Sequence, residues 1–143
     1  MKYIKLYEQA QPEKSVGYYP NGSIESEAWY QNGKLHREDG PAYIEYYQDG
    51  SIESEAWHRT GKIHREDGPA WLRYYSNGSV ESEEWYQNGE RHREDGPAQI
   101  GYQPDGSVGY DRWWVEGKQA KARDITSLED FRAWQYLKSV GLV

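Results

Sequence analysis

The heptapeptide HREDGPA occupies residues 36–42 and returns unchanged at residues 64–70 and 92–98. The three copies are 28 residues apart, with no insertion between them. A catalytic site is normally built once, whereas a sequence that repeats at a fixed period of this length marks a stack of equal structural units. The motif therefore predicts architecture more directly than it predicts chemistry.

The 28-residue period extends well beyond this heptapeptide. A glycine, a tryptophan and, in three copies, a histidine keep the same step. In the fourth copy the chain reads AKARDIT at residues 120–126, where HREDGPA would return. A terminal copy that departs from the pattern is typical of the cap at the end of a stack. The repeated positions are Gly22, Gly50, Gly78 and Gly106; Trp29, Trp57, Trp85 and Trp113; and His36, His64 and His92.

Each copy contains two turn signals, separated by short segments rich in Tyr, Trp, Ile and Val. Asn-Gly and Asp-Gly pairs favour type I′ turns, because both central residues take a positive φ. The short segments between the turns are typical of β-strands. The sequence thus predicts an all-β repeat fold, an elongated antiparallel meander of stacked β-hairpins with about eight strands. The turns fall at 21–22, 49–50, 77–78 and 105–106, and at 32–33, 60–61, 88–89 and 116–117.

A two-residue loop at Asp49-Gly50 would fix the register of its hairpin. It would place Tyr46 opposite Glu53 and Ile44 opposite Glu55, and paired residues share a face of the sheet. We interpret the face whose residues recur in each copy as the packing face. The prediction puts Ala42, Ile44, Tyr46, Glu53, Glu55 and Trp57 on this face.

The whole chain, residues 1–143, is expected to form one domain. Residues 1–17 read as a lead-in strand, 18–119 as the hairpin repeats, and 120–143 as a linker followed by a helix. Thr126 or Ser127 can cap this helix, and Gly141 suits its C-terminal end. We expect the helix to cap the stack by packing over the last strands. Its apolar row is Leu128, Phe131, Trp134 and Leu137.

The charge distribution disfavours two classes of partner. The chain has a net charge of −7; residues 1–14 hold +1 and residues 127–143 hold 0, which leaves −8 on residues 15–126. Neutralising phosphates on nucleic acid or on an anionic membrane needs the opposite sign. A protein with a basic surface fits better. No cofactor is expected, and the absence of cysteine excludes thiolate metal sites.

Glutamates recur in two columns along the repeats, beside aromatic residues. Such columns place like charges in register on successive hairpins, an arrangement that costs stability unless it is offset. One interpretation is a solvated face balanced by Arg37, Arg65 and Arg93. The other is a surface for a basic partner, since Tyr and Trp beside charge are typical interface anchors. The predicted partner-binding residues are Glu25, Glu27, Glu53, Glu55, Glu81, Glu83, Tyr43 and Trp71.

Turn chemistry explains every residue of the HREDGPA motif. The turn at residues 32–33 would bring His36 opposite Trp29, where the imidazole can stack on the indole, and Arg37 can pair with a neighbouring carboxylate. A metal site at His36, Glu38 and Asp39 is weaker, because one imidazole and two adjacent carboxylates make a poor ligand set. Acid–base catalysis is also weaker, because repeated shallow sites lack the single concave pocket of most enzymes.

Taken together, these residues resemble MORN-type repeats. The carriers are Tyr-Tyr-x-Asn/Asp-Gly-Ser-Ile/Val, a Trp seven residues after the glycine, and a following Asn-Gly-Lys. The closest form is the longer variant Trp-Tyr-x-Asn-Gly-x-x-His-Arg-Glu-Asp-Gly-Pro-Ala, common in phage and large-virus proteins. The resemblance covers about residues 18–119. It implies an elongated sheet of hairpins used for scaffolding and protein binding and, in some members, for lipid contact.

These observations predict a non-enzymatic protein-binding module. The viral form of the repeat suggests a phage accessory protein or inhibitor that acts on a host protein in the host cytoplasm. Two alternatives stay open, namely a hydrolase or metal-dependent enzyme that uses the His/Asp/Glu residues of HREDGPA, and a DNA-mimic inhibitor. The unpaired edge strands of such a sheet would also let a second copy of the chain pair there. No segment approaches the roughly 18 apolar residues that suggest a membrane span.

Overall fold

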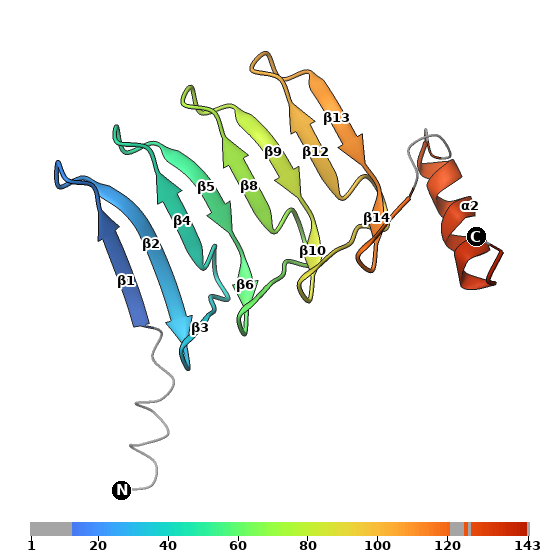
Figure 1. Cartoon of the computed structure of the whole chain (residues 1–143), viewed down its shortest axis with the longest axis horizontal. Helices are drawn as coiled ribbons and strands as arrows, with labels where there is room; N and C mark the ends of the chain where they lie inside the picture. Colours follow the sequence, from blue (N-terminus) through green and yellow to red (C-terminus); the bar gives the residue numbers. More distant parts are fainter. Residues whose placement is uncertain (1–12, 121–124, 126, 143) are drawn as a thin grey trace, which may run out of the picture.

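The computed structural model describes residues 13–120, 125 and 127–142. Its main feature is an antiparallel sheet in which eight strands follow one another in chain order along a single path (Figure 1). The predicted meander of hairpins is therefore confirmed. The strands of this path are β1 (Glu13–Tyr18), β2 (Ile24–Gln31), β4 (Tyr43–Tyr46), β5 (Ile52–Ala56), β8 (Trp71–Tyr74), β9 (Val80–Glu84), β12 (Gln99–Tyr102) and β13 (Val108–Arg112).

A short two-stranded ribbon follows the second strand of each hairpin. Figure 1 shows these ribbons at one end of the sheet, while the hairpin loops lie at the other end. The first ribbon is formed by the end of β2 with β3 (Lys34–Leu35). The others are β6 (His58–Arg59) with β7 (Lys62–Ile63), β10 (Tyr86–Gln87) with β11 (Glu90–Arg91), and β14 (Trp114–Val115) with β15 (Lys118–Gln119).

The ribbon turns have the type I′ conformation that the sequence predicts. Asn32 has a φ of 52° and Gly33 a φ of 71°, and the equivalent pairs in the other copies are also positive at both residues. Thr60 and Glu116 adopt this conformation without being Asn or Asp. A two-residue turn therefore forms even where the first residue is a poor fit, since the twist of the flanking strands favours it.

The hairpin turns differ from the prediction. At Asp49-Gly50 only the glycine has a positive φ, of 85°. The Gly50 N–H donates to the Tyr47 carbonyl at 2.9 Å, and the Tyr47 N–H donates to the Ser51 carbonyl at 2.8 Å. This is a three-residue loop, a type I turn followed by a left-handed glycine. The Asp49 carboxylate stabilises it by accepting from both the N–H and the hydroxyl of Ser51.

The longer loop changes the register beside it. Tyr46 pairs with Ile52 rather than with Glu53, which becomes the extra residue of a β-bulge. Beyond the bulge Ile44 pairs with Glu55, as predicted. The prediction that Glu53 and Glu55 share a face is therefore wrong. The same shift occurs at the equivalent places of the other hairpins.

We name the two faces of the sheet by what they carry. The interlocking face carries the repeat tryptophans, the aliphatic residues Ile44, Leu72 and Ile100, and the glutamates that pair with them. The groove face carries the alternate residues, among them Tyr43, Ser54, Ala56, Trp71 and Tyr86. No helix covers either face of the eight-stranded path within the described residues (Figure 1).

The backbone connects neighbouring hairpins where the sheet gives way to the ribbons. The Trp57 N–H donates to the Ala70 carbonyl at 2.7 Å, and the Ala42 N–H donates to the Ala56 carbonyl at 2.9 Å. Ala42, Ala70 and Ala98 have no exposed surface. The alanine that ends HREDGPA is thus buried at the junction of two repeats, where a larger side chain would have no room.

Helix α2 (Leu128–Ser139) follows the last ribbon. Ser127 caps it, its hydroxyl accepting from the Asp130 N–H at 3.1 Å, and Gly141 ends it with a φ of 75°. Leu128, Phe131 and Trp134 pack on a small core, whereas all five residues of β13 are exposed. The helix therefore packs on the last ribbon, β14–β15, as predicted, and leaves the residues of β13 exposed. The core consists of Trp113, Val115, Ala120, Ile125 and Phe131.

Three predicted features lie wholly or partly outside the described residues. They are the first part of the lead-in strand, the linker at 121–124 and the alternative cap Thr126. Within the described residues, no helix is both long and apolar enough to cross a membrane.

Candidate binding surfaces

The HREDGPA loops form an ordered ladder on the interlocking face. The Arg37 guanidinium lies over the Trp29 ring, with its central carbon 4.1 Å from the ring centroid. Its Nε donates to Asp39 at 2.9 Å, and its Nη1 donates to the Pro41 carbonyl at 3.3 Å. Arg65 over Trp57 and Arg93 over Trp85 repeat this arrangement, at 4.2 Å and 3.9 Å. The arginine therefore joins the loop to the tryptophan through cation–π contact and hydrogen bonds.

The glycine of HREDGPA lets the arginine lie close to the loop backbone. A Cβ added at Gly68 would lie 3.0 Å from the central carbon of the Arg65 guanidinium, and one at Gly96 would lie 2.9 Å from that of Arg93. The arginine also acts on the neighbouring acid. Its hydrogen bond and charge hold the pKa of Asp67 below the ordinary value for aspartate. Arg and Asp are thus paired inside the loop, as predicted for Arg37 and its neighbouring carboxylate.

His36 lies opposite Trp29 as predicted, and its backbone N–H donates to the Trp29 carbonyl at 3.0 Å. The side chain that lies over the Trp29 ring is that of Arg37. The Nδ1 of His36 instead accepts a hydrogen bond from the backbone N–H of Thr60 in the next ribbon, at 3.0 Å. His64 accepts in the same way from Asn88, and His92 from Glu116. Each repeat histidine thus links one copy to the next through a hydrogen bond.

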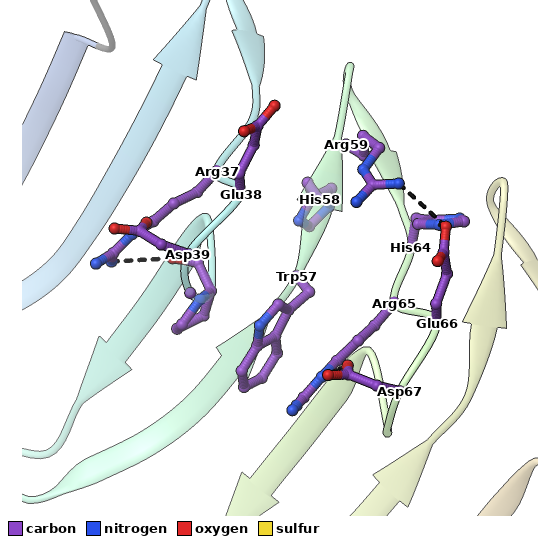
Figure 2. A pocket seen from close by; sticks show the side chains of 12 residues that line it. Arg37, Glu38, Asp39, Trp57, His58, Arg59, His64, Arg65, Glu66 and Asp67 are labelled. Atoms are coloured by element: carbon purple, nitrogen blue, oxygen red, sulfur yellow. Dashed lines mark hydrogen bonds and ion pairs between the residues drawn. The ribbon is translucent and has the colours of Figure 1, made fainter.

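Clefts separate successive HREDGPA loops. The one between residues 37–41 and 64–67 has a volume of about 530 Å³, and its counterpart one repeat later has about 600 Å³. Figure 2 shows Arg65 alongside Trp57, and Arg59 directed to Glu66 on the far wall. Asp39 and Asp67 are bound to arginines rather than directed together. Within the described part of the chain, no group of three His, Asp or Glu side chains is placed to hold a metal ion.

The glutamate column at positions 27, 55 and 83 belongs to the interlocking face. Glu55 accepts from the Tyr74 hydroxyl at 2.8 Å, and Glu27 and Glu83 accept from Tyr46 and Tyr102 at 3.2 Å. Burial, together with the hydrogen bond and charge of Glu55, raises the pKa of Tyr74. Tyrosines rather than Arg37, Arg65 and Arg93 bind these carboxylates. The column is therefore largely engaged within the fold.

The column at positions 25, 53 and 81 consists of the extra residues of the bulges, and the interactions of Glu53 and Glu81 are with residues of the groove face. Glu81 pairs with Arg73, with a 3.6 Å distance between oxygen and nitrogen, and both side chains are well exposed. Burial raises the pKa of Tyr47, and the negative charge of Glu53 raises it further. Of the two predicted columns, this one remains accessible to a partner.

A groove of about 460 Å³ runs over the groove face between the sheet and the ribbons. Both aromatic residues predicted to bind a partner, Tyr43 and Trp71, line it. Its one carboxylate, Glu45, accepts from the Tyr43 hydroxyl at 3.0 Å and from the Ser54 hydroxyl at 2.7 Å. Burial lowers the pKa of His58, which favours its neutral form. The remaining lining residues are Tyr30, Leu35, Ala56, Ile63 and Tyr86.

Sequence reasoning missed Glu45 and the ribbon residues that wall this groove. The residue types at these repeat positions differ from copy to copy, so the sequence period does not reveal them. Tyr30, His58, Tyr86 and Trp114 stand at one equivalent position, and Glu45, Arg73 and Gly101 at another. Variation at a fixed place of an otherwise constant repeat was the available clue.

The comparison with protein families agrees with this architecture. The family model for the MORN repeat variant matches residues 14–32, which span β1, its hairpin loop and β2. This first hairpin is therefore similar to the MORN repeat variant. Neither a curated protein nor a solved structure matches the chain significantly.

Proposed function

We propose that this chain is a non-enzymatic protein-binding module and that its groove face binds a protein with a basic surface. The observation that carries this proposal is the position of the aromatic groove beside the accessible glutamate column. Tyr43 and Trp71 supply apolar contact area, and Glu25, Glu53 and Glu81 supply charge along the same face. Aromatic anchors with a complementary charged rim are typical of protein interfaces.

The interlocking face supports this assignment, because its side chains are already engaged with one another. Its tryptophans are stacked with arginines, and its glutamates accept tyrosine hydroxyls. The clefts between the HREDGPA loops hold ion pairs rather than a set of converging free groups. Among the described residues, the clefts therefore show no arrangement of side chains that specifically favours the enzymatic alternative.

The full HREDGPA form of the repeat resembles the variant that is common in phage and large-virus proteins. On this basis we propose a phage accessory protein that occupies a basic surface of a host protein in the host cytoplasm. Inhibition of that host protein would follow if the occupied surface normally binds an anionic ligand. The net charge of −7 favours fast, salt-sensitive association with such a partner.

Two triple variants test which face binds. Glu25, Glu53 and Glu81 changed to Gln remove three charges from the groove face, and Glu27, Glu55 and Glu83 changed to Gln remove three from the interlocking face. A partner is first captured from host lysate at low salt and purified. Its association rate with each variant is then measured over a salt series.

The groove-face variant should associate about tenfold more slowly at low salt and show a flatter salt dependence. The interlocking-face variant should retain most of the wild-type rate, because its glutamates are held within the fold. Equal rates and equal salt slopes for the wild type and the groove-face variant would contradict the proposal.

A further inference from the structure

One repeat of the groove face contains its own cation. The Arg91 guanidinium lies against two aromatic rings, with its central carbon 5.3 Å from the centroids of both Tyr86 and Trp114. Two of its nitrogens contact one oxygen of Glu84, Nε at 2.9 Å and Nη2 at 2.7 Å. Tyr86 donates its hydroxyl to the same carboxylate oxygen at 2.7 Å, and Gln99 donates to the other oxygen at 3.2 Å. This site is a filled arginine pocket.

The same positions one repeat earlier lack both charged partners. A step of 28 residues converts Glu84 into Ala56 and Arg91 into Ile63. The ring positions of Tyr86 and Trp114 become His58 and Tyr86. All four of these residues line the 460 Å³ groove. The groove therefore lies where the earlier repeat has lost the side chains that fill the later one.

The groove retains the features that suit an arginine side chain. Leu35 and Ile63 offer apolar surface to a methylene stem, and Tyr43, Trp71 and Tyr86 offer aromatic rings to a planar cation. Glu45 supplies a carboxylate from β4. It lies two residues along the strand from Tyr43, the residue that pairs with Ala56, and therefore on the same face of the sheet. His58 is the one other titratable group besides the tyrosines in this lining, and its neutral form adds no positive charge.

We propose that the groove receives an arginine side chain of the partner protein, in the place that Arg91 fills in the following repeat. The guanidinium lies over Ala56 against the aromatic walls, and its charge meets Glu45 rather than a counterpart of Glu84. This inference rests on the proposed function and deepens it, because it states the chemistry by which the groove face selects its partner.

The first test uses a defined probe. A short alanine peptide with one central arginine is compared with the same peptide carrying citrulline, which keeps the shape and removes the charge. Binding is followed by NMR through the indole N–H signal of Trp71. The arginine peptide should bind about tenfold more tightly, since cation–π and charge-assisted contacts are both lost with citrulline. Equal shifts and affinities for the two peptides would overturn the inference.

The second test fills the groove from within. The double variant Ala56→Glu with Ile63→Arg copies the Glu84–Arg91 arrangement into the earlier repeat, and it should abolish the Trp71 response to the arginine peptide. Glu45→Gln tests the same point without adding bulk and should weaken binding about tenfold. Circular dichroism and the urea midpoint establish that each variant is folded. Arginine binding that is unchanged in folded Glu45→Gln would overturn the inference.

The two proposals can fail separately. If the purified basic partner binds the filled variant and the wild type equally, the arginine inference is overturned while the proposed function stands. If no basic protein binds but the groove still prefers arginine over citrulline, the inference is supported as a ligand site and the proposed function is wrong.

Discussion

The two faces of this sheet use the same repeat in opposite ways. On the interlocking face the residues at equivalent positions are nearly constant, and the same contact recurs in the three HREDGPA copies, as Arg37, Arg65 and Arg93 show with their tryptophans. On the groove face the equivalent positions change, as from Glu45 to Arg73. Constancy therefore marks the contacts that join the units, and variation marks the surface that is free to acquire a binding site.

The end of the stack sharpens this comparison. The fourth tryptophan, Trp113, has no HREDGPA arginine after it, because the chain reads AKARDIT there. Phe131 of α2 contacts it instead, with the ring centroids 4.6 Å apart. An apolar side chain from a helix thus takes over the partner role of the arginine where the repeat stops. If the interlocking face holds the units together, substitutions that remove its contacts should lower the free energy of unfolding more than substitutions elsewhere.

The largest loss is expected for Phe131→Ala. Phe131 is fully buried, and it joins the helix to Trp113. Its truncation should lower the free energy of unfolding by about 3–5 kcal/mol, since it removes a large apolar side chain and leaves a cavity. Urea unfolding checks this, with Tyr136→Ala on the exposed side of the same helix as the control. Equal midpoints for the two variants would show that the helix does not stabilise the stack.

A smaller loss is expected for Gly68→Val. The added side chain would displace the Arg65 guanidinium from its position over Trp57. We expect a decrease of about 2 kcal/mol in the free energy of unfolding, typical of overpacking. Gln87→Val, on an exposed ribbon strand, is the control for introducing a β-branched residue. A fully stable Gly68→Val would mean that the arginine is not fixed by the loop.

His64→Ala should have a milder effect. It removes the imidazole nitrogen that accepts from the Asn88 N–H. This hydrogen bond is exposed, so a water molecule can accept from the N–H in place of the imidazole. A loss of about 1 kcal/mol is expected, the usual value for one hydrogen bond. Glu66→Ala is the matched control, because Glu66 lies 3.5 Å from the other ring nitrogen of His64. If Glu66→Ala costs more than His64→Ala, the link to the next ribbon is not what the histidine contributes.

The repeat predicted most of the fold because its signals are local. Gly and Asn at fixed places determine turns, and the alternation of aromatic and polar residues determines strands. The hairpin loop was mispredicted because Asp49-Gly50 suits two loop types, and the local dipeptide does not distinguish them. The loop closed by Tyr47 and Ser51 adds one residue, which moved Glu53 to the other face. That single shift separated the two glutamate columns.

The candidate site was predictable only in part. Tyr43 and Trp71 were found because they are large aromatics on the less constant face. The walls formed by Leu35, Ile63 and Tyr86 depend on how the ribbons lie against the sheet, which no local pattern states. The position of α2 depended likewise on Phe131 finding Trp113, a contact between residues 18 apart in the sequence. Tertiary packing, rather than propensity, decided these features.

One pair of substitutions tests the difference between the faces most directly. Arg65 and Arg73 belong to the same repeat, but Arg65 lies over Trp57 and bonds to Asp67 and Pro69, whereas Arg73 has one exposed 3.6 Å ion pair. The free energy of unfolding in urea is measured for Arg65→Gln and Arg73→Gln. We predict a loss of about 2 kcal/mol for Arg65→Gln and less than about 0.5 kcal/mol for Arg73→Gln. Equal losses, or a larger one for Arg73→Gln, would contradict the division of the sheet into an interlocking face and a face free to bind.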